Sequence, residues 1–403
     1  MDARRRPDTL NSVKTCCWQL TMKVVFFATR VPDLCGAFLH DIDLAIELQN
    51  RGHSVVWMTL DKPPQGVQGG TYRGFRFMHF TAGTSFLESS EVWICPHAPA
   101  LPGVRRVNAR GFDRPIIATC HFDGRYQTIT SNGSNQWKEM LFFINQTMES
   151  AFRKNIVPWP SYIVRTGVVR PILHEFKIKM DSPPDGDCIT LVNANVNKGV
   201  HQFIAIAKAM PEKRFLGVLP YYGELWVPQG APGNLEWTPF DDDIRNILKR
   251  TRILLMPSYS ESFGRIAVEA MYNGIPVLYT KPIKNVAVST DGMEEWITPA
   301  GIPCEREKIE EWVAAIETLD DQDVYAAKSE EVKEHVQKLD FFTEAPKIAE
   351  QVEQFVRENP VIVQKSLQVQ QARSVQDATA APTLRPTQPT GRVGLVGGRL
   401  KLR

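Results

Sequence analysis

The sequence lacks any run of about 18 apolar residues, the length that a helix needs to cross a membrane. Its first 21 residues are basic but hold no apolar segment of the kind that a secretory signal peptide requires. The first strong structural signal begins at Met22. We therefore expect no transmembrane segment and a cytoplasmic location, with residues 1–21 either an N-terminal extension or sequence upstream of a true start at Met22.

Cysteine is scarce and shows no regular spacing. The seven cysteines are odd in number, scattered, and contain no C-x-x-C pair. Disulfide frameworks and structural zinc sites need paired or regularly spaced cysteines. The pattern therefore predicts reduced thiols and no zinc site. As separate expectations, we predict no other metal site, no obligatory divalent cation and no cofactor.

The chain also lacks a large overall charge, but its net charge of +2 is unevenly spread. Residues 1–170 hold 20 Lys and Arg against 13 Asp and Glu, and residues 360–403 hold seven against one. Basic segments of this kind favour an anionic partner such as nucleic acid, a phospholipid or a phosphorylated glycan. An ordinary solvated surface is the alternative interpretation.

What the sequence does contain is a long alternation of short apolar strands and amphipathic helices. The run Lys23–Thr29 is continuously apolar, apolar residues then recur at helical spacing as far as Gly52, and a second strand follows at Ser54–Leu60. Such strand–helix–strand units build parallel sheets with helices on both faces. The expected strands are residues 23–29, 54–60, 75–80, 92–95, 116–119, 189–193, 214–219, 253–256 and 275–279, and the later helices are residues 200–210, 242–250, 264–273 and 306–319.

A proline-rich stretch divides this alternation into two series. Residues 155–171 lack helical periodicity, so we place the link between domains there. After Asn359 the composition shifts to Gln, Ser, Thr, Pro and Gly, which cannot bury enough apolar surface to fold. We predict two Rossmann-like, doubly wound α/β domains at 22–170 and 171–359, facing across a cleft, and a disordered basic tail at 360–403.

The stretch ILLMPSYSESFGRIAVEAMYNGIPVL, which begins at Ile253, carries the strongest chemical signal. A buried strand ends at Pro257, and a helix begins near Gly264. The free N–H groups and positive dipole end of such a helix suit a diphosphate. Glu261 and Glu269 stand eight residues apart, roughly 8–12 Å at helical rise. That separation suits a donor sugar at one carboxylate and a ribose at the other.

The string P-S-x-x-E-S-F-G-x-x-x-x-E-A-M-x-x-G-x-P-V resembles the E-x7-E signature of retaining GT-B glycosyltransferases, the family of glycogen synthases and many bacterial glycan-building enzymes. Three further segments resemble the same family in the expected order: TRVPDLCG ending at Gly36, RPIIATCHFDG containing His121, and Asn197-Lys198-Gly199 before a helix. One position departs from the family pattern. Asn193-Ala194-Asn195 stands where a glycine and a diphosphate-binding arginine are usual. We therefore expect either that Lys198 and helix N–H groups bind the diphosphate without an arginine or that Arg265 takes the place of the missing arginine.

The resemblance implies a GT-B fold and transfer from a UDP- or GDP-sugar with retention at the anomeric carbon. It assigns Glu261, His121 and Lys198 as catalytic residues. The implied donor-binding residues are Gly36, Lys198, Ser262, Phe263, Gly264, Arg265 and Glu269. Basic residues near His121 are candidates for the acceptor site: Arg105, Arg106, Arg110, Arg114 and Arg125.

The expected acceptor is a glycan, a lipid-linked or a small molecule. Three alternatives stay open. The same chemistry on a hydroxymethylpyrimidine in DNA would use the basic front half and tail. A nucleotide-sugar epimerase would share the two-domain fold, and a catalytically inactive sugar-nucleotide-binding protein would fit the missing arginine.

Overall fold

The structure is a computed structural model that describes residues 21–28, 36–61, 71–95, 100–121, 126–220, 231–283 and 290–361. Nearly all of the expected N-terminal extension and of the expected disordered tail lies outside these residues. Within the described part, no helix is long and apolar enough to cross a membrane.

The first half of the chain forms an eight-stranded sheet in the order β3-β4-β2-β1-β5-β6-β7-β8. Neighbouring strands are parallel except for β3 with β4. Along β1, Val24 and Phe26 pack in one core and Val25 and Phe27 in the other, so this strand is buried on both faces as its sequence predicts. The strands are β1 (Lys23–Ala28), β2 (Ser54–Thr59), β3 (Thr71–Tyr72), β4 (Phe75–His79), β5 (Val92–Cys95), β6 (Ile116–Cys120), β7 (Glu139–Phe143) and β8 (Ile163–Val168).

The second half forms a six-stranded parallel sheet in the order β11-β10-β9-β12-β13-β14. Its strand order reverses between β9 and β12, and ligands of open α/β sheets bind outside the carboxyl ends of strands at such a switch point. The loops that follow these two strands are therefore the expected site. The strands are β9 (Cys188–Val192), β10 (Phe215–Val218), β11 (Leu235–Thr238), β12 (Thr251–Met256), β13 (Val277–Thr280) and β14 (Ile302–Cys304).

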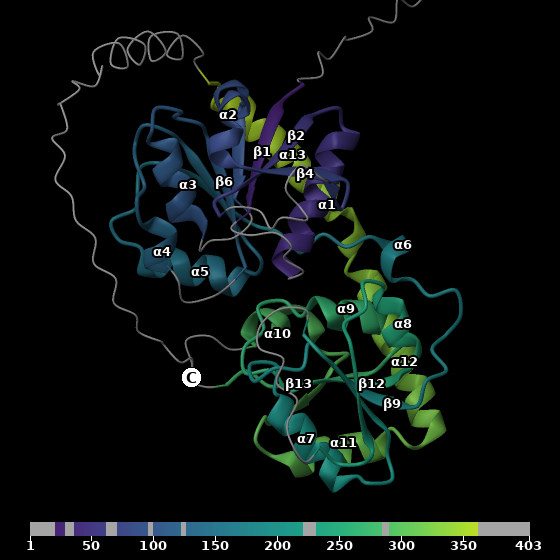
Figure 1. Ribbon diagram of the computed structural model, residues 1–403. Helices are drawn as coiled ribbons and strands as arrows, with labels where there is room; N and C mark the ends of the chain where they lie inside the picture. Colours follow the sequence, from purple (N-terminus) through teal and green to yellow (C-terminus); the bar gives the residue numbers. More distant parts are fainter. Residues whose placement is uncertain are drawn as a thin grey trace, which may run out of the picture. The chain divides into compact units, whose positions relative to one another are not determined.

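Helices follow most of these strands (Figure 1). The helix α1 ends where predicted, with Gly52 at φ +90°, the left-handed conformation that favours glycine after a helix. In the first half the helices are α1 (Gly36–Asn50), α2 (Thr84–Ser89), α3 (Leu101–Asn108), α4 (Tyr126–Thr130) and α5 (Gln146–Asn155). In the second half they are α6 (Glu175–Ile178), α7 (Val200–Ala209), α8 (Ile244–Lys249), α9 (Arg265–Tyr272), α10 (Asp291–Ile297), α11 (Ile309–Thr318), α12 (Gln322–Lys338) and α13 (Glu344–Glu358).

Two segments differ from the domain organisation expected from the sequence. The expected link at 155–171 contains β8, which pairs with β7 as the edge strand of the first sheet. The last helix, α13, falls in the expected second domain but packs against α1 (Figure 1). Its Glu353 accepts hydrogen bonds from Arg51 and contacts His53. The chain therefore crosses back to the first sheet after α12.

Candidate active site

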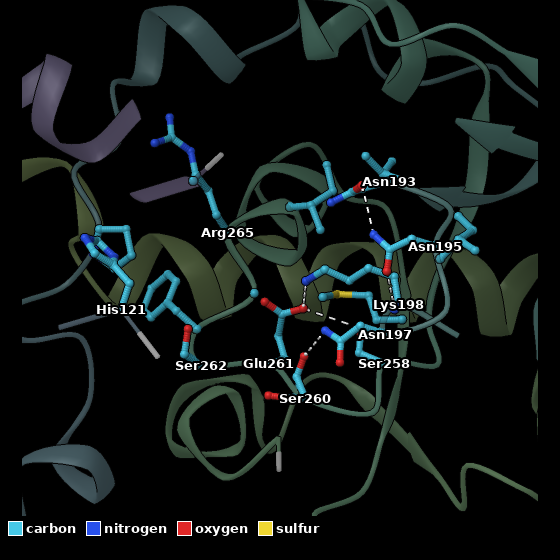
Figure 2. Close-up of a pocket in the computed structure, with 18 of the residues that line it drawn as sticks. His121, Asn193, Asn195, Asn197, Lys198, Ser258, Ser260, Glu261, Ser262 and Arg265 are labelled. Atoms are coloured by element: carbon cyan, nitrogen blue, oxygen red, sulfur yellow. Dashed lines mark hydrogen bonds and ion pairs between the residues drawn. The ribbon is translucent and has the colours of Figure 1, made fainter. Parts of the chain in front are cut away.

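A cavity of about 520 Å³ lies at the carboxyl ends of β9 and β12 (Figure 2). The first half contributes Gly36 and Ala37 at the start of α1, His121 after β6, Ile144 and Pro171. The second half contributes the loop after β9 and the loop after β12. The cavity thus lies where the parallel-sheet topology predicts a ligand site.

The loop after β12 (residues 257–264) contains residues that the resemblance assigns to donor binding, so we call it the donor loop, and it leads into α9. Gly264 adopts φ +76°, and a Cβ there would lie 2.6 Å from Sδ of Met293, so the turn requires glycine. Among the described residues no side chain caps the N-terminus of α9. Ser262, Phe263 and Gly264 line the cavity. The start of α9 therefore offers uncapped backbone N–H groups next to the cavity.

The loop after β9 (residues 193–199) packs closely against the donor loop. Gly199 adopts φ +81°, and a Cβ there would overlap the carbonyl oxygen of Pro257. The backbone N–H of Tyr259 donates to the carbonyl oxygen of Asn197 at 2.8 Å. This close approach brings Lys198 and Glu261, 63 residues apart in sequence, into an ion pair. The sequence identified both residues but not their pairing.

Two asparagines occupy the position where an arginine is expected from the resemblance. Asn193 adopts φ +62°, a left-handed conformation that asparagine tolerates better than most residues. The side-chain amide of Asn195 donates to Oδ1 of Asn193 at 3.1 Å, and its Oδ1 accepts from the backbone N–H of Lys198 at 3.0 Å. Both asparagines line the cavity, where they offer neutral hydrogen-bonding groups in place of a cation.

Arg265 is held by groups of the protein itself. Its Nε donates to Oε1 of Glu269 at 2.8 Å and its Nη1 to the carbonyl oxygen of Ile172 at 3.2 Å. Its Nη2 also lies 3.8 Å from Oδ2 of Asp43 on α1. Burial raises the pKa of Glu269, and the charge of Arg265 acts in the opposite direction. Arg265 therefore pairs with the buried Glu269 carboxylate and also faces Asp43, whose nearer partner is Lys177 at 2.5 Å.

A second cavity of about 240 Å³ adjoins the first. Gly36, Asn193 and Arg265 line both cavities, Glu261 lines only the first, and Glu269 lines only the second. The two glutamates of the motif thus belong to separate, adjoining spaces. This division matches a ligand with chemically different ends.

Residues 229–339 match the family model described as Glycosyl transferases group 1. The matched segment contains the donor loop, both glutamates and α9. The chain carries a group 1 glycosyltransferase domain.

Among curated proteins, the D-inositol 3-phosphate glycosyltransferase of Corynebacterium kroppenstedtii is 28% identical over 120 residues. That alignment spans 30% of this chain and only 25% of the relative's length. The likeness is therefore local and covers part of each protein.

Solved structures resemble this chain over most of its length. HepE of Anabaena, in a complex with UDP-glucose, has a TM-score of 0.66 and 16% identity, covering 83% of this chain and 100% of that chain. Sucrose-phosphate synthase of Thermosynechococcus elongatus has a TM-score of 0.62 and 16% identity, covering 83% and 98%. At such identities the likeness establishes the fold. The predicted GT-B fold with two Rossmann-like sheets is confirmed.

His121 lines the larger cavity and contacts His40, a histidine that the sequence analysis did not identify. The rings of His121 and His40 meet edge to face, with centroids 5.4 Å apart. Nδ1 of His40 accepts from the backbone N–H of Ile172 at 2.9 Å. Burial, aided by the charge of Arg265, lowers the pKa of His40 to about 3. His40 is therefore neutral at ordinary pH. The available signal was its position one helical turn after Gly36.

The structure corrects the expected acceptor arginines. Arg105 is fully buried, forms a bidentate pair with Glu139, and donates to two backbone carbonyl oxygens of residues 129 and 131. Arg114 is also buried and donates to backbone carbonyl oxygens of α2. Neither can contact an acceptor. Arg106 and Arg110 are exposed, and Arg125 lies outside the described residues.

Within the described residues, no group of three His, Cys, Asp or Glu side chains is arranged to hold a metal ion. Charged side chains line both cavities: Lys198, Glu261 and Arg265 line the first, and Asp43, Arg73, Lys177, Asp241, Asp242, Arg265 and Glu269 line the second.

Proposed function

We propose that this protein transfers a sugar from a nucleotide-sugar donor to an acceptor hydroxyl, with retention at the anomeric carbon. The observation that carries the proposal is the placement of Glu261 and Glu269 in adjoining cavities on either side of Arg265. In this arrangement the donor sugar occupies the larger cavity, near Glu261 and His121. The nucleoside occupies the smaller one, where Glu269 binds the ribose hydroxyls.

The diphosphate then lies between the two ends, at the N-terminus of α9. Backbone N–H groups at Gly264 and Arg265 and the ammonium group of Lys198 would bind its oxygens. Arrival of the diphosphate would draw Lys198 from Glu261, and this frees the carboxylate to accept bonds from sugar hydroxyls. Preorganised donors of this kind stabilise charge as it develops on a leaving group.

The reaction proposed here breaks the bond between the anomeric carbon and the phosphate oxygen. The acceptor oxygen forms its bond on the same face of the sugar, and the departing diphosphate oxygen takes the acceptor's proton. His121 would bond a sugar hydroxyl or shield the positive charge that develops on the sugar. Catalysis then depends on positioning and on charge stabilisation by side chains and backbone N–H groups, and the proposal assigns no step to a metal ion.

For the acceptor we propose a glycan, a lipid-linked or a small molecule. A modified base in DNA would need a basic surface, and the burial of Arg105 and Arg114 removes two of the arginines that suggested one. Arg106 and Arg110 remain exposed. The cytoplasmic location stays a prediction.

A donor screen tests the proposed function. Purified protein is incubated with UDP-, GDP- and ADP-sugars, and release of nucleoside diphosphate is measured. UDP-glucose is the first choice because HepE, which shares the fold, was solved in complex with it. Conversion of the sugar without diphosphate release would indicate an epimerase. Acceptor trials, which include hydroxymethylated DNA, then follow. A protein that binds the nucleotide-sugar but shows no turnover with any acceptor would be an inactive binding protein.

Glu269→Ala should weaken binding of the preferred nucleotide about tenfold or more. A carboxylate that accepts hydrogen bonds from ribose hydroxyls contributes about 1.5–3 kcal/mol. Isothermal titration with UDP or GDP measures the change, and Glu334→Ala, on the exposed face of α12, serves as the control. An unchanged dissociation constant would remove Glu269 from the nucleoside site.

A further inference from the structure

The helix α10 lies beside the donor loop and contacts it at two points. Nε1 of Trp296 donates to the carbonyl oxygen of Phe263 at 2.7 Å, and the two rings stack with centroids 5.4 Å apart. Met293 fills the space over Gly264. The donor loop is therefore fixed to one face of α10.

The same helix also reaches the first half of the chain, at the N-terminus of α5. The carboxylate of Glu295 accepts from the backbone N–H of Gln146 at 3.0 Å and from that of Thr147 at 2.7 Å. It also accepts from the Thr147 hydroxyl. A negative charge at a helix N-terminus is stabilised by the helix dipole as well as by these bonds.

A third contact joins α5 directly to the donor loop. Asn145 caps α5, with its Oδ1 accepting from the backbone N–H of Met148 at 2.7 Å. Its Nδ2 donates to the carbonyl oxygen of Ser262 at 2.7 Å. Gly292 of α10 passes so close that a Cβ there would overlap both of these groups. The first three N–H groups of α5 are thus all bonded, two of them by Glu295.

We propose that Glu295 is a positioning residue that holds the donor loop in register with the half of the molecule that carries His121. The proposal rests on the proposed function, since it gives the donor loop its role. Glu295 is exposed and contributes nothing to either core, yet it makes three bonds across two elements 148 or more residues apart in sequence. Those bonds form only when α5 and α10 are correctly placed, and the same two elements hold Ser262, through Asn145, and Phe263, through Trp296.

The test compares wild type with Glu295→Gln, which keeps the size of the side chain and removes its charge. Amide hydrogen exchange on the full chain should become faster at Gln146 and Thr147 and, through α10, in the donor loop. With UDP-glucose as the probe, kcat for UDP release should fall about two- to fivefold, the weight of one charge at a helix N-terminus. The dissociation constant of UDP should change less than twofold.

Glu334→Gln removes the charge of another exposed glutamate, which pairs with Lys338 within α12, and should change none of these quantities. Glu295→Asp keeps the charge and should recover part of the lost kcat. A lower melting temperature without faster exchange in the donor loop and without loss of kcat would overturn the proposal, because it would make Glu295 merely structural. If wild type releases no UDP, the proposed function fails for this donor, while the exchange measurement still decides the role of Glu295.

Discussion

Replacing Lys198 with alanine should reduce turnover about a hundredfold, the usual effect of removing one preorganised donor from a developing negative charge. Donor affinity should fall much less. The leaving diphosphate gains charge as the glycosidic bond breaks, so an ammonium group beside it binds the transition state more tightly than the ground state. Steady-state release of UDP from UDP-glucose and titration with UDP measure the two effects separately.

The ion pair with Glu261 sets the controls for this experiment. Among the described residues, the partner that the Glu261 carboxylate keeps in Lys198→Ala is the Ser258 hydroxyl, at 3.4 Å, so part of the loss reflects an unpaired charge. The double variant Lys198→Ala, Glu261→Gln removes that contribution. Lys213→Ala, which breaks an ion pair with Asp320 away from the cavity, should leave turnover unchanged. Equal losses of affinity and turnover would make Lys198 only a ground-state anchor.

The sequence predicts those features that depend on local pattern. All nine expected strands are present, with ends within two residues of those predicted, because a strand buried on both faces leaves a continuous apolar run. The turn at Gly264 is equally local. A glycine can adopt the left-handed backbone conformation that this turn requires, and the helix α9 begins at the next residue.

Features that depend on distant partners could not be predicted in this way. The apolar face of α13 is buried, but nothing in its own sequence indicates that this helix packs against α1 of the first half. The pairing of Lys198 with Glu261 depends on how closely two loops pack. The short run before β8 contains prolines, which favoured a link over an edge strand.

Arg105 is the clearest case, because a cluster of arginines predicts a charged surface unless a buried partner is known. Its partner, Glu139, is 34 residues away at the start of a buried strand, and both side chains are fully buried. Nε1 of Trp137 also donates to Glu139, at 2.7 Å. The carboxylate is thus satisfied only through contacts that the sequence does not display.

Arg105→Ala should therefore lower the free energy of unfolding by about 3–5 kcal/mol, the effect of leaving one member of a buried ion pair without its partner. Chemical denaturation of the full chain measures the change. Arg106→Ala, the exposed neighbour on α3, should stay within about 0.5 kcal/mol of wild type. The double variant Arg105→Met, Glu139→Leu should recover much of the lost stability, because apolar side chains of similar volume replace both charges.

If Arg105→Ala lowers the free energy of unfolding by less than about 1 kcal/mol, water or another group compensates the charge of Glu139. The ion pair would then not explain why Arg105 is buried. The same three variants separate stability from acceptor binding. If Arg106→Ala lowers transfer to an acceptor without changing donor hydrolysis, while the Arg105 and Glu139 double variant transfers normally, the acceptor surface includes Arg106 and excludes Arg105. The reverse result would return Arg105 to the acceptor site and require that α3 open to expose it.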